Sequence, residues 1–404
     1  MPHFLLVACL LNCPILIADA QTDSISDSAV DCERIYQAPG HGISFYEENP
    51  TYIDPRLETG LLPSATPASH GLDAKMLEKG VSILREEKRT LSLIVVKDGD
   101  VVVEEYFHGS AANQSNNIHS ASKSIMSTLV GIAIDQGFIK SVDQRLSDFL
   151  PEYFSDSDSA LKRSLTIRHL LTMSAGFEWR HDPVSGTEIE IQKKPDWVGA
   201  VLSLPIVDPP GSKFFYNTGL THLMSAVIGQ ATGMSTCQFA HRYLLEPIGI
   251  TVEHWGRDPQ GVYSGGYNFY ITPREMATFG ELILNGGRYK DRQIVPRDWI
   301  KKSFEPAFER SNGEGSNPWF TDDKMGYGYN WWLLHIKEQD LIAAWGWGGQ
   351  MIYIIPQLDT VVVITRDTSN AKEVAEHPFN DNFVRDYILP WGGEVGRTRN
   401  GRQR

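Results

Sequence analysis

The chain has 404 residues, of which 41% are hydrophobic and 22% are charged, and its formal net charge is −13. This length exceeds that of most single hydrophobic cores, so two lobes or domains are expected. Acidic residues outnumber basic ones by 50 to 37, and no basic stripe interrupts them. The composition therefore argues against a nucleic acid or an anionic membrane surface as a partner. It does not predict an oligomeric state.

An apolar run near the N-terminus extends from Phe4 to Ile17 and is broken only by Asn12 and Pro14. The segment ADA at residues 18–20 follows it and fits a signal-peptidase site. The run is too short to span a bilayer, so no stable membrane insertion is expected. We therefore expect residues 1–20 to be a signal peptide cleaved after Ala20, and the mature protein to be secreted or periplasmic. Since the first three residues carry no Lys or Arg, an uncleaved anchor is the alternative.

Cleavage at this site would leave two cysteines in the mature chain, Cys32 and Cys237. One disulfide is possible in an exported protein, but two cysteines do not build a disulfide framework. Cys237 lies in MSTCQFAHRYLLEPIGI, a stretch typical of a buried helix. We therefore expect a core thiol at this position, and the pairing with Cys32 stays open.

The predicted elements begin after a polar, turn-rich leader at residues 21–70. LSLIVVKDGDVVVEEYF, residues 91–107, predicts a β-hairpin because two β-branched runs are joined by Asp98-Gly99. Helices with long loops are expected from residue 138 to about residue 325, among them LTIRHLLTMSAGF and TPREMATFGELILNGG. Strands are then predicted at YGYNWWLL, LIAAW, QMIYIIP and TVVVITRD, and a final amphipathic helix at NDNFVRDYIL.

Strands at both ends of the chain around a helical middle indicate an α+β protein. Residues 71–137 and 326–395 would form a sheet-containing lobe. Residues 138–325 would form a mostly helical lobe inserted into it, and the two lobes together would make one catalytic domain.

The stretch SNNIHSASKSIMSTLVGIAIDQG, residues 115–137, holds Ser120 three residues before Lys123 at the head of an apolar helix. Positions i and i+3 share a helix face, so the amine can reach the hydroxyl. A lysine that is kept away from water loses its proton more readily and can then act as a base towards Ser120. The pattern predicts a nucleophilic serine that is activated without a histidine. An N-cap serine beside a solvated lysine would give the same spacing.

Other chemical motifs are chance matches or are missing. The same spacing occurs at Ser159 with Lys162 and at Ser369 with Lys372, in polar segments that precede no long apolar helix. Gly-x-Ser-x-Gly, His-Glu-x-x-His and paired Cys-x-x-Cys sequences are absent, so no nucleophile elbow and no metal site are expected. No cofactor is expected either. His119 is interpreted as a packed neighbour of the nucleophile, while a Ser-His-Asp triad stays open in a chain with 12 histidines.

Two further segments complete an ordered set of motifs. DPPGSKFFYNTGLTHLMSAVIGQATGMS, residues 208–235, has a Pro-Gly turn before YNT and a helix, and AAWGWGGQMIYIIP, residues 343–356, sets a glycine-rich turn against a strand. With the Ser-x-x-Lys motif, and with LTIRHLLTMSAGFEW and GGYNFYITPREMATFGELILNGG, this set resembles the serine β-lactamase-related family. That family comprises class C β-lactamases, D,D-peptidases and related esterases and amidases, including 6-aminohexanoate-dimer hydrolases. The resemblance implies a β-lactamase/transpeptidase-like fold with an antiparallel sheet flanked by helices.

The resemblance also implies a role for each matching residue. Ser120 matches the nucleophile, and Lys123 matches the lysine base beside it. Tyr216 matches the tyrosine that relays protons between the nucleophile and the leaving group. Thr218 stands at a substrate-binding position where the family often has Asn or Ser.

The third family motif is a strand segment that ends in glycine, and it falls on AWG at residues 344–346. The N–H groups of Ser120 and Trp347 would then form the oxyanion hole. Indole surface suits an apolar ligand, and it equally suits ordinary packing. The further substrate-binding residues are expected at the rim of the cleft: Trp179, Trp345 and Gly346.

The residues and the resemblance agree on acyl transfer, in which Ser120 attacks a carbonyl, an acyl-enzyme forms and water releases the acid. We expect a serine hydrolase acting on a small ester or amide. A β-lactamase or D,D-peptidase with the same site is one alternative, and a catalytically silent binding protein on the same fold is another. Family members that act on carboxylate-bearing substrates usually place Lys or His at the third motif. No cation occurs here between residues 341 and 355, which favours neutral substrates.

Overall fold

The computed structural model describes Cys32 and residues 52–53, 62–182, 185–310, 324–376 and 382–391. The predicted signal peptide, residues 1–20, and most of the predicted leader lie outside these residues. The described residues belong to one compact unit. No helix within the described ranges is long and apolar enough to cross a membrane.

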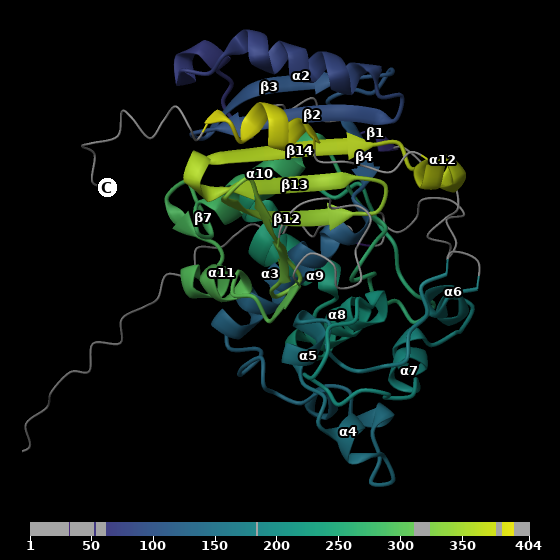
Figure 1. Ribbon diagram of the computed structural model, residues 1–404. Helices are drawn as coiled ribbons and strands as arrows, with labels where there is room; N and C mark the ends of the chain where they lie inside the picture. Colours follow the sequence, from purple (N-terminus) through teal and green to yellow (C-terminus); the bar gives the residue numbers. More distant parts are fainter. Residues whose placement is uncertain are drawn as a thin grey trace, which may run out of the picture. The chain divides into compact units, whose positions relative to one another are not determined.

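An antiparallel sheet forms the upper half of this unit in the view of Figure 1. The predicted hairpin is confirmed: its two strands turn through Asp98 and Gly99, which have φ angles of 51° and 87°. Left-handed backbone at both turn positions matches the twist of the paired strands. Eight strands of the described residues pair in this spatial order: β3 (Asp100–Tyr106), β2 (Thr90–Lys97), β14 (Thr360–Arg366), β13 (Gln350–Ile355), β12 (Gln339–Gly346), β11 (Trp332–Ile336), β10 (Lys324–Tyr327) and β9 (Phe308–Arg310).

Both faces of the sheet are covered by helices. On one face, α2 (Ala74–Glu86) and residues 382–391 pack into a single apolar core with inward-facing side chains of the strands. On the other face, α10 (Pro273–Leu284) contacts β2, β13 and β14. The contact is so close that a Cβ added at Gly280 would lie 2.6 Å from Val361 Cγ1. Apolar burial on two faces explains why the central strands read as continuous hydrophobic runs.

The helices between residues 122 and 240 lie together below the sheet in Figure 1. The apolar helix expected near residue 120 is α3, which is buried along almost its whole length and packs between β12 and α8. α3 (Ser122–Asp135) and α8 (Thr218–Thr232) are long. The remaining α-helices of the described residues are short: α4 (Ala160–Arg163), α5 (Ile167–Leu171), α6 (Thr187–Gln192), α7 (Trp197–Leu202), α9 (Thr236–Ala240), α11 (Arg297–Ser303) and α12 (Ala371–Glu376).

Two small sheets complete the described strands. Four short strands pair in the order β1 (Tyr52–Ile53), β4 (Gln114–Asn117), β6 (Phe269–Ile271) and β5 (His254–Trp255), and a separate pair joins β7 (Arg288–Tyr289) to β8 (Arg292–Gln293). β4 leads directly into the turn that carries Ser120. The strand β1 and a 3₁₀ turn, η1 (Pro67–His70), fall within the region predicted to be an irregular leader.

The predicted lobe boundaries stay a prediction. Residues 308–310 form the edge strand β9, and α10 packs on the sheet, although both fall within the range predicted for the helical lobe. At the C-terminal side, the expected amphipathic helix is a short π-helical turn, η8 (Val384–Ile388), whose inner side joins the apolar core.

The prediction of one strand at YGYNWWLL is wrong, because the chain turns inside it. β10 ends at Tyr327 and β11 begins at Trp332. A Cβ at Gly328 would lie 2.0 Å from the Ser303 carbonyl oxygen, and Asn330 adopts a φ of 58°. Glycine tolerates the close approach of the Ser303 carbonyl, and asparagine tolerates left-handed backbone. The chain can therefore turn between Tyr327 and Trp332, and the stretch folds as a hairpin.

The expectation of a core thiol at Cys237 is also wrong. Cys237 is fully buried, as expected, but it forms a disulfide with Cys32 across 205 residues of sequence. The backbone carbonyl of Cys32 also accepts a hydrogen bond from the Tyr263 hydroxyl at 2.8 Å. Cys32, which is distant in the sequence, thus lies beside α9. The local apolar pattern around Cys237 could not indicate this contact.

Candidate active site

The predicted nucleophile lies in a 3₁₀ turn, η2 (His119–Ala121), immediately before α3. Lys123 Nζ donates a hydrogen bond to Ser120 Oγ at 2.8 Å and a second one to the Gly266 carbonyl at 3.0 Å. Lys123 is only 1% exposed, whereas Ser120 is partly exposed. The lysine is therefore not a solvated first-turn residue, and its amine has the geometry of a base beside an accessible hydroxyl.

Burial controls the protonation of this amine. Removal from water lowers the pKa of Lys123 from 10.5 to about 7, while the carboxylate of Glu188 acts in the opposite direction. A lysine with an ordinary pKa of about 10.4 would carry a proton almost all the time at neutral pH. Burial of Lys123 therefore allows a substantial share of its amine to be unprotonated near neutral pH.

His119 is a packed neighbour, in agreement with its interpretation. It is fully buried, and its Nε2 lies 3.1 Å from Thr368 Oγ1. Burial and the charge of Lys123 lower the pKa of His119 to about 3, so its imidazole stays neutral. Its φ of 47° is in the left-handed region, where a residue with a side chain is strained. This conformation directly precedes Ser120 at the head of α3.

Tyr216 joins this pair from the loop before α8. Lys123 Nζ lies 5.1 Å from the centre of the Tyr216 ring. Burial raises the pKa of Tyr216, and its hydrogen-bonding interaction with Ser120 lowers it in part. The structure thus brings Ser120 and Lys123 together with Tyr216 from two separate segments, as predicted, although their catalytic roles remain predictions.

Thr218 is the first residue of α8, and Asn217 caps that helix by accepting a hydrogen bond from the Gly219 N–H at 2.8 Å. The side chain of Thr218 opposes in part the rise that burial causes in the pKa of Glu188. Its methyl group faces Gly266, where an added Cβ would lie 2.9 Å from Thr218 Cγ2 and 2.8 Å from Lys123 Nζ. Thr218 therefore lies in the wall that surrounds the lysine.

The third-motif turn touches the turn of the nucleophile. A Cβ at Gly346 would lie 2.1 Å from the carbonyl oxygen of Ile118, so only glycine allows the two backbones to meet. The Trp347 ring contacts His119 edge-on, with ring centroids 5.3 Å apart. The N–H groups of Ser120 and Trp347 hence belong to adjoining turns, and the oxyanion hole stays a prediction.

Aromatic side chains line the side of the site next to Tyr216. Trp332 stacks on Tyr216 with ring centroids 5.8 Å apart, and Trp345 meets Trp332 at 5.5 Å. Trp332 and Trp345 are both partly exposed. Trp179, in contrast, is 7% exposed and packs beneath the start of α8, where its ring approaches Gly219. Of the tryptophans predicted to bind substrate, Trp345 is therefore the one that presents an accessible ring.

The cationic side chains on the strand before the third motif form ion pairs away from the site. His335 pairs with Asp340 at 2.7 Å, and Lys337 binds Asp386 at 3.2 Å. Both lie at the β11–β12 turn, whereas Gly346 is at the other end of β12, roughly 20 Å away for a strand of this length. The guanidinium of buried Arg89 does reach the third-motif turn, where it donates to the carbonyls of residues 348 and 367.

Glu188 was not predicted from the sequence. It lies on α6, and its carboxylate oxygen Oε1 is shielded from solvent, with no hydrogen-bond partner among the described residues. Burial raises the pKa of Glu188 to about 7, against the opposing effect of Lys123. TEIEIQ carries no motif, so nothing local distinguishes this glutamate from a solvated one. Gly266 was missed as a contact of Lys123, although the Gly-Gly pair before YNF was part of the resemblance.

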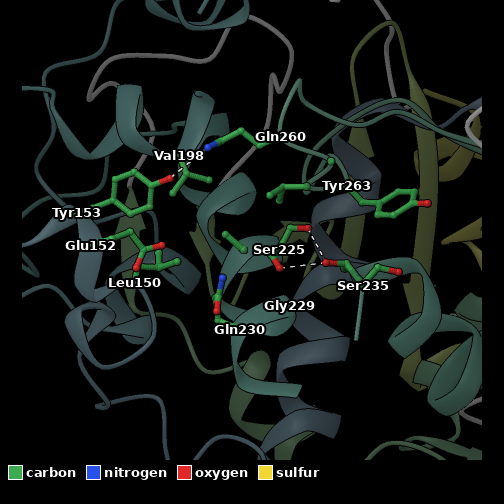
Figure 2. Close-up of a pocket in the computed structure, with 14 residues that line it drawn as sticks. Leu150, Glu152, Tyr153, Val198, Ser225, Gly229, Gln230, Ser235, Gln260 and Tyr263 are labelled. Carbon is green, nitrogen blue, oxygen red and sulfur yellow. Dashed lines mark hydrogen bonds between the residues drawn. The ribbon is translucent and has the colours of Figure 1, made fainter. Parts of the chain in front are cut away.

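A separate pocket opens away from these residues, between the loop at 258–263 and helices α7 and α8 (Figure 2). Its volume is about 310 Å³. Hydrogen-bonded polar side chains line it. Gln260 Nε2 lies 3.5 Å from the Tyr153 hydroxyl, and Ser225 Oγ lies 2.8 Å from Thr236 Oγ1. None of the residues predicted for catalysis lines it.

The Ser-x-x-Lys match at residues 159–162 has a different geometry. Ser159 caps α4, while Lys162 Nζ binds the Tyr153 carbonyl at 2.8 Å and Asp158 at 3.2 Å. In the part of the chain that the structure describes, no cluster of three or more His, Cys, Asp or Glu side chains could hold a metal ion.

Comparison with known proteins gives consistent matches. The β-lactamase family model matches residues 78–384. The 6-aminohexanoate-dimer hydrolase of Paenarthrobacter ureafaciens is 25% identical over 293 residues, which cover 69% of this chain and 72% of that protein. A candidate 6-aminohexanoate-dimer hydrolase from Bacillus anthracis has a TM-score of 0.65 at 19% identity, covering 87% of this chain and 92% of its own. A family VIII carboxylesterase has a TM-score of 0.58 at 16% identity, covering 78% of this chain and 95% of its own.

These likenesses confirm the predicted fold class, an antiparallel sheet flanked by helices in the β-lactamase/transpeptidase arrangement. The family model spans the hairpin, α3, the loop that carries Tyr216 and the third-motif turn in one continuous match. The chain belongs to the β-lactamase family.

Proposed function

We propose that this chain is a serine hydrolase that cleaves small, uncharged esters or amides through an acyl-enzyme on Ser120. The observation that carries the proposal is the hydrogen bond of 2.8 Å from buried Lys123 to the partly exposed Ser120 hydroxyl. A hydroxyl beside an amine whose pKa lies near neutrality has what an activated nucleophile needs. The related 6-aminohexanoate-dimer hydrolase supports hydrolysis of an acyl bond as the reaction class.

The reaction proceeds in two half-reactions. In the first, Ser120 Oγ bonds to the substrate carbonyl carbon while its proton passes to neutral Lys123. The amides of Ser120 and Trp347 stabilise the developing oxyanion, and Tyr216 conveys a proton to the departing alkoxide or amine. In the second, water attacks the acyl-enzyme by the reverse proton transfers and releases the acid.

The lining of the site supports a neutral, apolar substrate. Trp332 and Trp345 present indole surface beside Tyr216, while His335 and Lys337 are paired at the far turn of the sheet. A substrate carboxylate would lose hydration on entering aromatic surface and gain no charge-assisted hydrogen bond from these groups. Such a bond is worth about 1.5–3 kcal/mol, or roughly ten- to a hundredfold in binding.

A direct comparison of substrates tests the proposal. The mature chain should react covalently with a fluorophosphonate probe at Ser120 and should hydrolyse short p-nitrophenyl esters. It should hydrolyse a chromogenic cephalosporin only feebly, and Ser120→Ala should lose both the labelling and the turnover. Cephalosporin turnover equal to the ester rate would favour a β-lactamase instead. Absence of any labelling would favour a binding protein on the same fold.

We also propose that the chain is exported and cleaved after Ala20. The apolar run before residue 18 and the disulfide between Cys32 and Cys237 support an oxidising compartment, because cytosolic thiols are kept reduced. Mass spectrometry of the N-terminal peptide from the producing cells tests this. A mature N-terminus at Gln21 is expected, and an intact N-terminus on cytosolic protein would contradict it.

A further inference from the structure

The strained turn before Ser120 is held by a side chain from the preceding strand. His119 has a φ of 47°, and a residue with a side chain keeps this left-handed conformation only where its surroundings stabilise it. The His119 backbone N–H donates a hydrogen bond to Asn117 Oδ1 at 3.0 Å. Asn117 is the last residue of β4, and a bond from its side chain to the backbone two residues further on is the usual way in which asparagine stabilises a turn.

The other end of the same amide reaches the segment that holds the lysine. Asn117 Nδ2 donates a hydrogen bond to Asn268 Oδ1 at 3.0 Å. Asn268 lies two residues after Gly266, whose carbonyl accepts a hydrogen bond from Lys123 Nζ at 3.0 Å. One side chain therefore bridges the turn of the candidate nucleophile and the segment that binds the candidate base. We call the bond from Asn117 to Asn268 the amide bridge.

Together these contacts close a ring of hydrogen bonds around Ser120. Four bonds make up the ring: Lys123 Nζ to Ser120 Oγ, Lys123 Nζ to the Gly266 carbonyl, Asn117 Nδ2 to Asn268 Oδ1, and the His119 N–H to Asn117 Oδ1. The chain itself closes the gaps between them, through residues 117–120 and 266–268. Groups that share one hydrogen-bond network depend on one another, so opening the ring at any point should affect the whole of it.

The segment at 264–268 is fixed on its other side by neighbouring helices. A Cβ at Gly265 would lie 1.8 Å from the Thr221 carbonyl oxygen, so this backbone contacts that of α8 directly. The Tyr267 hydroxyl accepts a hydrogen bond from Gln192 Nε2 of α6 at 2.8 Å. These contacts place the segment against the helices, whereas the amide bridge places it against the turn that carries the serine.

We propose that Asn117 is a positioning residue that acts through His119 and Lys123, and that its amide keeps the serine and the amine at hydrogen-bonding distance. Asn117 is 4% exposed, and its amide is bonded to the two segments, so it makes no contact with substrate. Without the bridge, the turn and the segment at 266–268 can move relative to each other. Proton transfer from serine to lysine depends steeply on that geometry. The inference rests on the proposed function and adds a residue that holds its reacting pair together.

Two substitutions remove the amide bridge from opposite ends. Asn117→Ser is too short to reach Asn268, but its hydroxyl can still accept the bond from the His119 N–H, as serine does in turns. Asn268→Gly removes the other partner, and glycine tolerates the φ of 53° at this position. The pairing of β4 with β6 should survive both changes, because the Ile118 N–H donates to the Phe269 carbonyl at 3.0 Å through the backbone alone.

Steady-state kinetics of the full mature chain with a p-nitrophenyl ester measure the effect. Each single variant should lower kcat by about ten- to a hundredfold, because the base is displaced, and leave KM within about twofold of the wild-type value, because substrate contacts are untouched. The variant with both substitutions should have a kcat within about threefold of the slower single variant, since either change already opens the ring. The rate of fluorophosphonate labelling should fall together with kcat.

Asn116 provides a matched control on the same strand. It is half-buried, and its Nδ2 donates to the Gln114 carbonyl at 3.4 Å, away from the ring. Asn116→Ser removes an amide from β4 and should keep the wild-type kcat. Thermal unfolding of each variant shows whether a loss of activity accompanies a loss of structure.

Unchanged kcat in either Asn117→Ser or Asn268→Gly would overturn the inference, whether or not thermal stability falls, and would leave the bridge a merely structural role. Losses that multiply in the double variant would also overturn it, because the two asparagines would then act independently. Asn268 is only half-buried, so Asn268→Gly decides the matter if Asn117→Ser does not fold. Wild-type protein that never reacts with the probe would instead overturn the proposed function itself.

Discussion

The substitution Gly266→Ala offers a sharp test of the Lys123 site. The new methyl carbon would lie 2.8 Å from Lys123 Nζ and 2.6 Å from Thr221 Oγ1. An ordinary contact begins at 3.4 Å, so the amine must withdraw by at least 0.6 Å, the difference between 3.4 and 2.8. The same Nζ now donates to Ser120 at 2.8 Å, and a displacement of this size misaligns that hydrogen bond.

Misplacement of a catalytic group by about 1 Å can cost about a hundredfold in rate. We therefore expect kcat/KM of Gly266→Ala for a p-nitrophenyl ester to fall by about a hundredfold. Overpacking should lower the free energy of unfolding by only about 1–3 kcal/mol, so the variant should still fold. Thermal unfolding followed by circular dichroism, together with the ester assay, separates the two effects.

Gly229→Ala is the matched control for this substitution. Gly229 lies in α8, and a Cβ there would meet its nearest neighbour, the Met234 carbonyl oxygen, at 3.8 Å. Alanine in a helix is favoured over glycine by about 0.5–1 kcal/mol, so this variant should keep full activity and gain slightly in stability. Wild-type kcat/KM in Gly266→Ala would refute the reasoning, because it would mean that the amine need not occupy its observed position.

Further predictions concern the base and the disulfide. Wild-type kcat/KM should rise with pH through about 7, because the amine of Lys123 must be neutral and burial lowers its pKa to that value; a limb near the ordinary lysine value of about 10.4 would contradict this. Lys123→Arg should lose nearly all ester hydrolysis, since guanidinium does not deprotonate, and an active arginine variant would exclude the role. Cys32→Ala should lower the free energy of unfolding by up to about 5 kcal/mol, because the disulfide closes a span of 205 residues; an unchanged urea midpoint would show that the cross-link contributes little.

Local chemistry made part of the structure predictable. Asp98-Gly99 between β-branched runs demands a tight hairpin, and that hairpin is present with left-handed backbone at both positions. The capping box of Thr272 and Glu275, with Pro273 at the first helical position, likewise begins α10 where the sequence predicts a helix. In each case residues close in sequence carry the whole signal, so no knowledge of tertiary contacts is needed.

The features that were missed depend on contacts between distant segments. Glu188 becomes part of the site only because α6 packs against the segment at 264–268. The sequence around Glu188 is an ordinary polar stretch, so it does not indicate that this side chain is shielded from solvent. Cys237 looks like a core thiol until Cys32 is brought to it. The break in YGYNWWLL follows from the approach of Gly328 to the Ser303 carbonyl, which is equally invisible to strand propensity.

The chemistry and the specificity of the site are built from different kinds of residue. The proposed reacting groups are placed by backbone constraints: the left-handed His119 before Ser120, Gly346 against the Ile118 carbonyl, and Gly266 against Lys123 Nζ. Side chains larger than hydrogen at either glycine would push these segments apart. In contrast, Trp332 and Trp345 meet at a ring separation of 5.5 Å and are partly exposed, so a smaller apolar side chain at either position leaves the backbone where it is. Changes at the aromatic wall should therefore alter which substrates bind without displacing the amine from the serine.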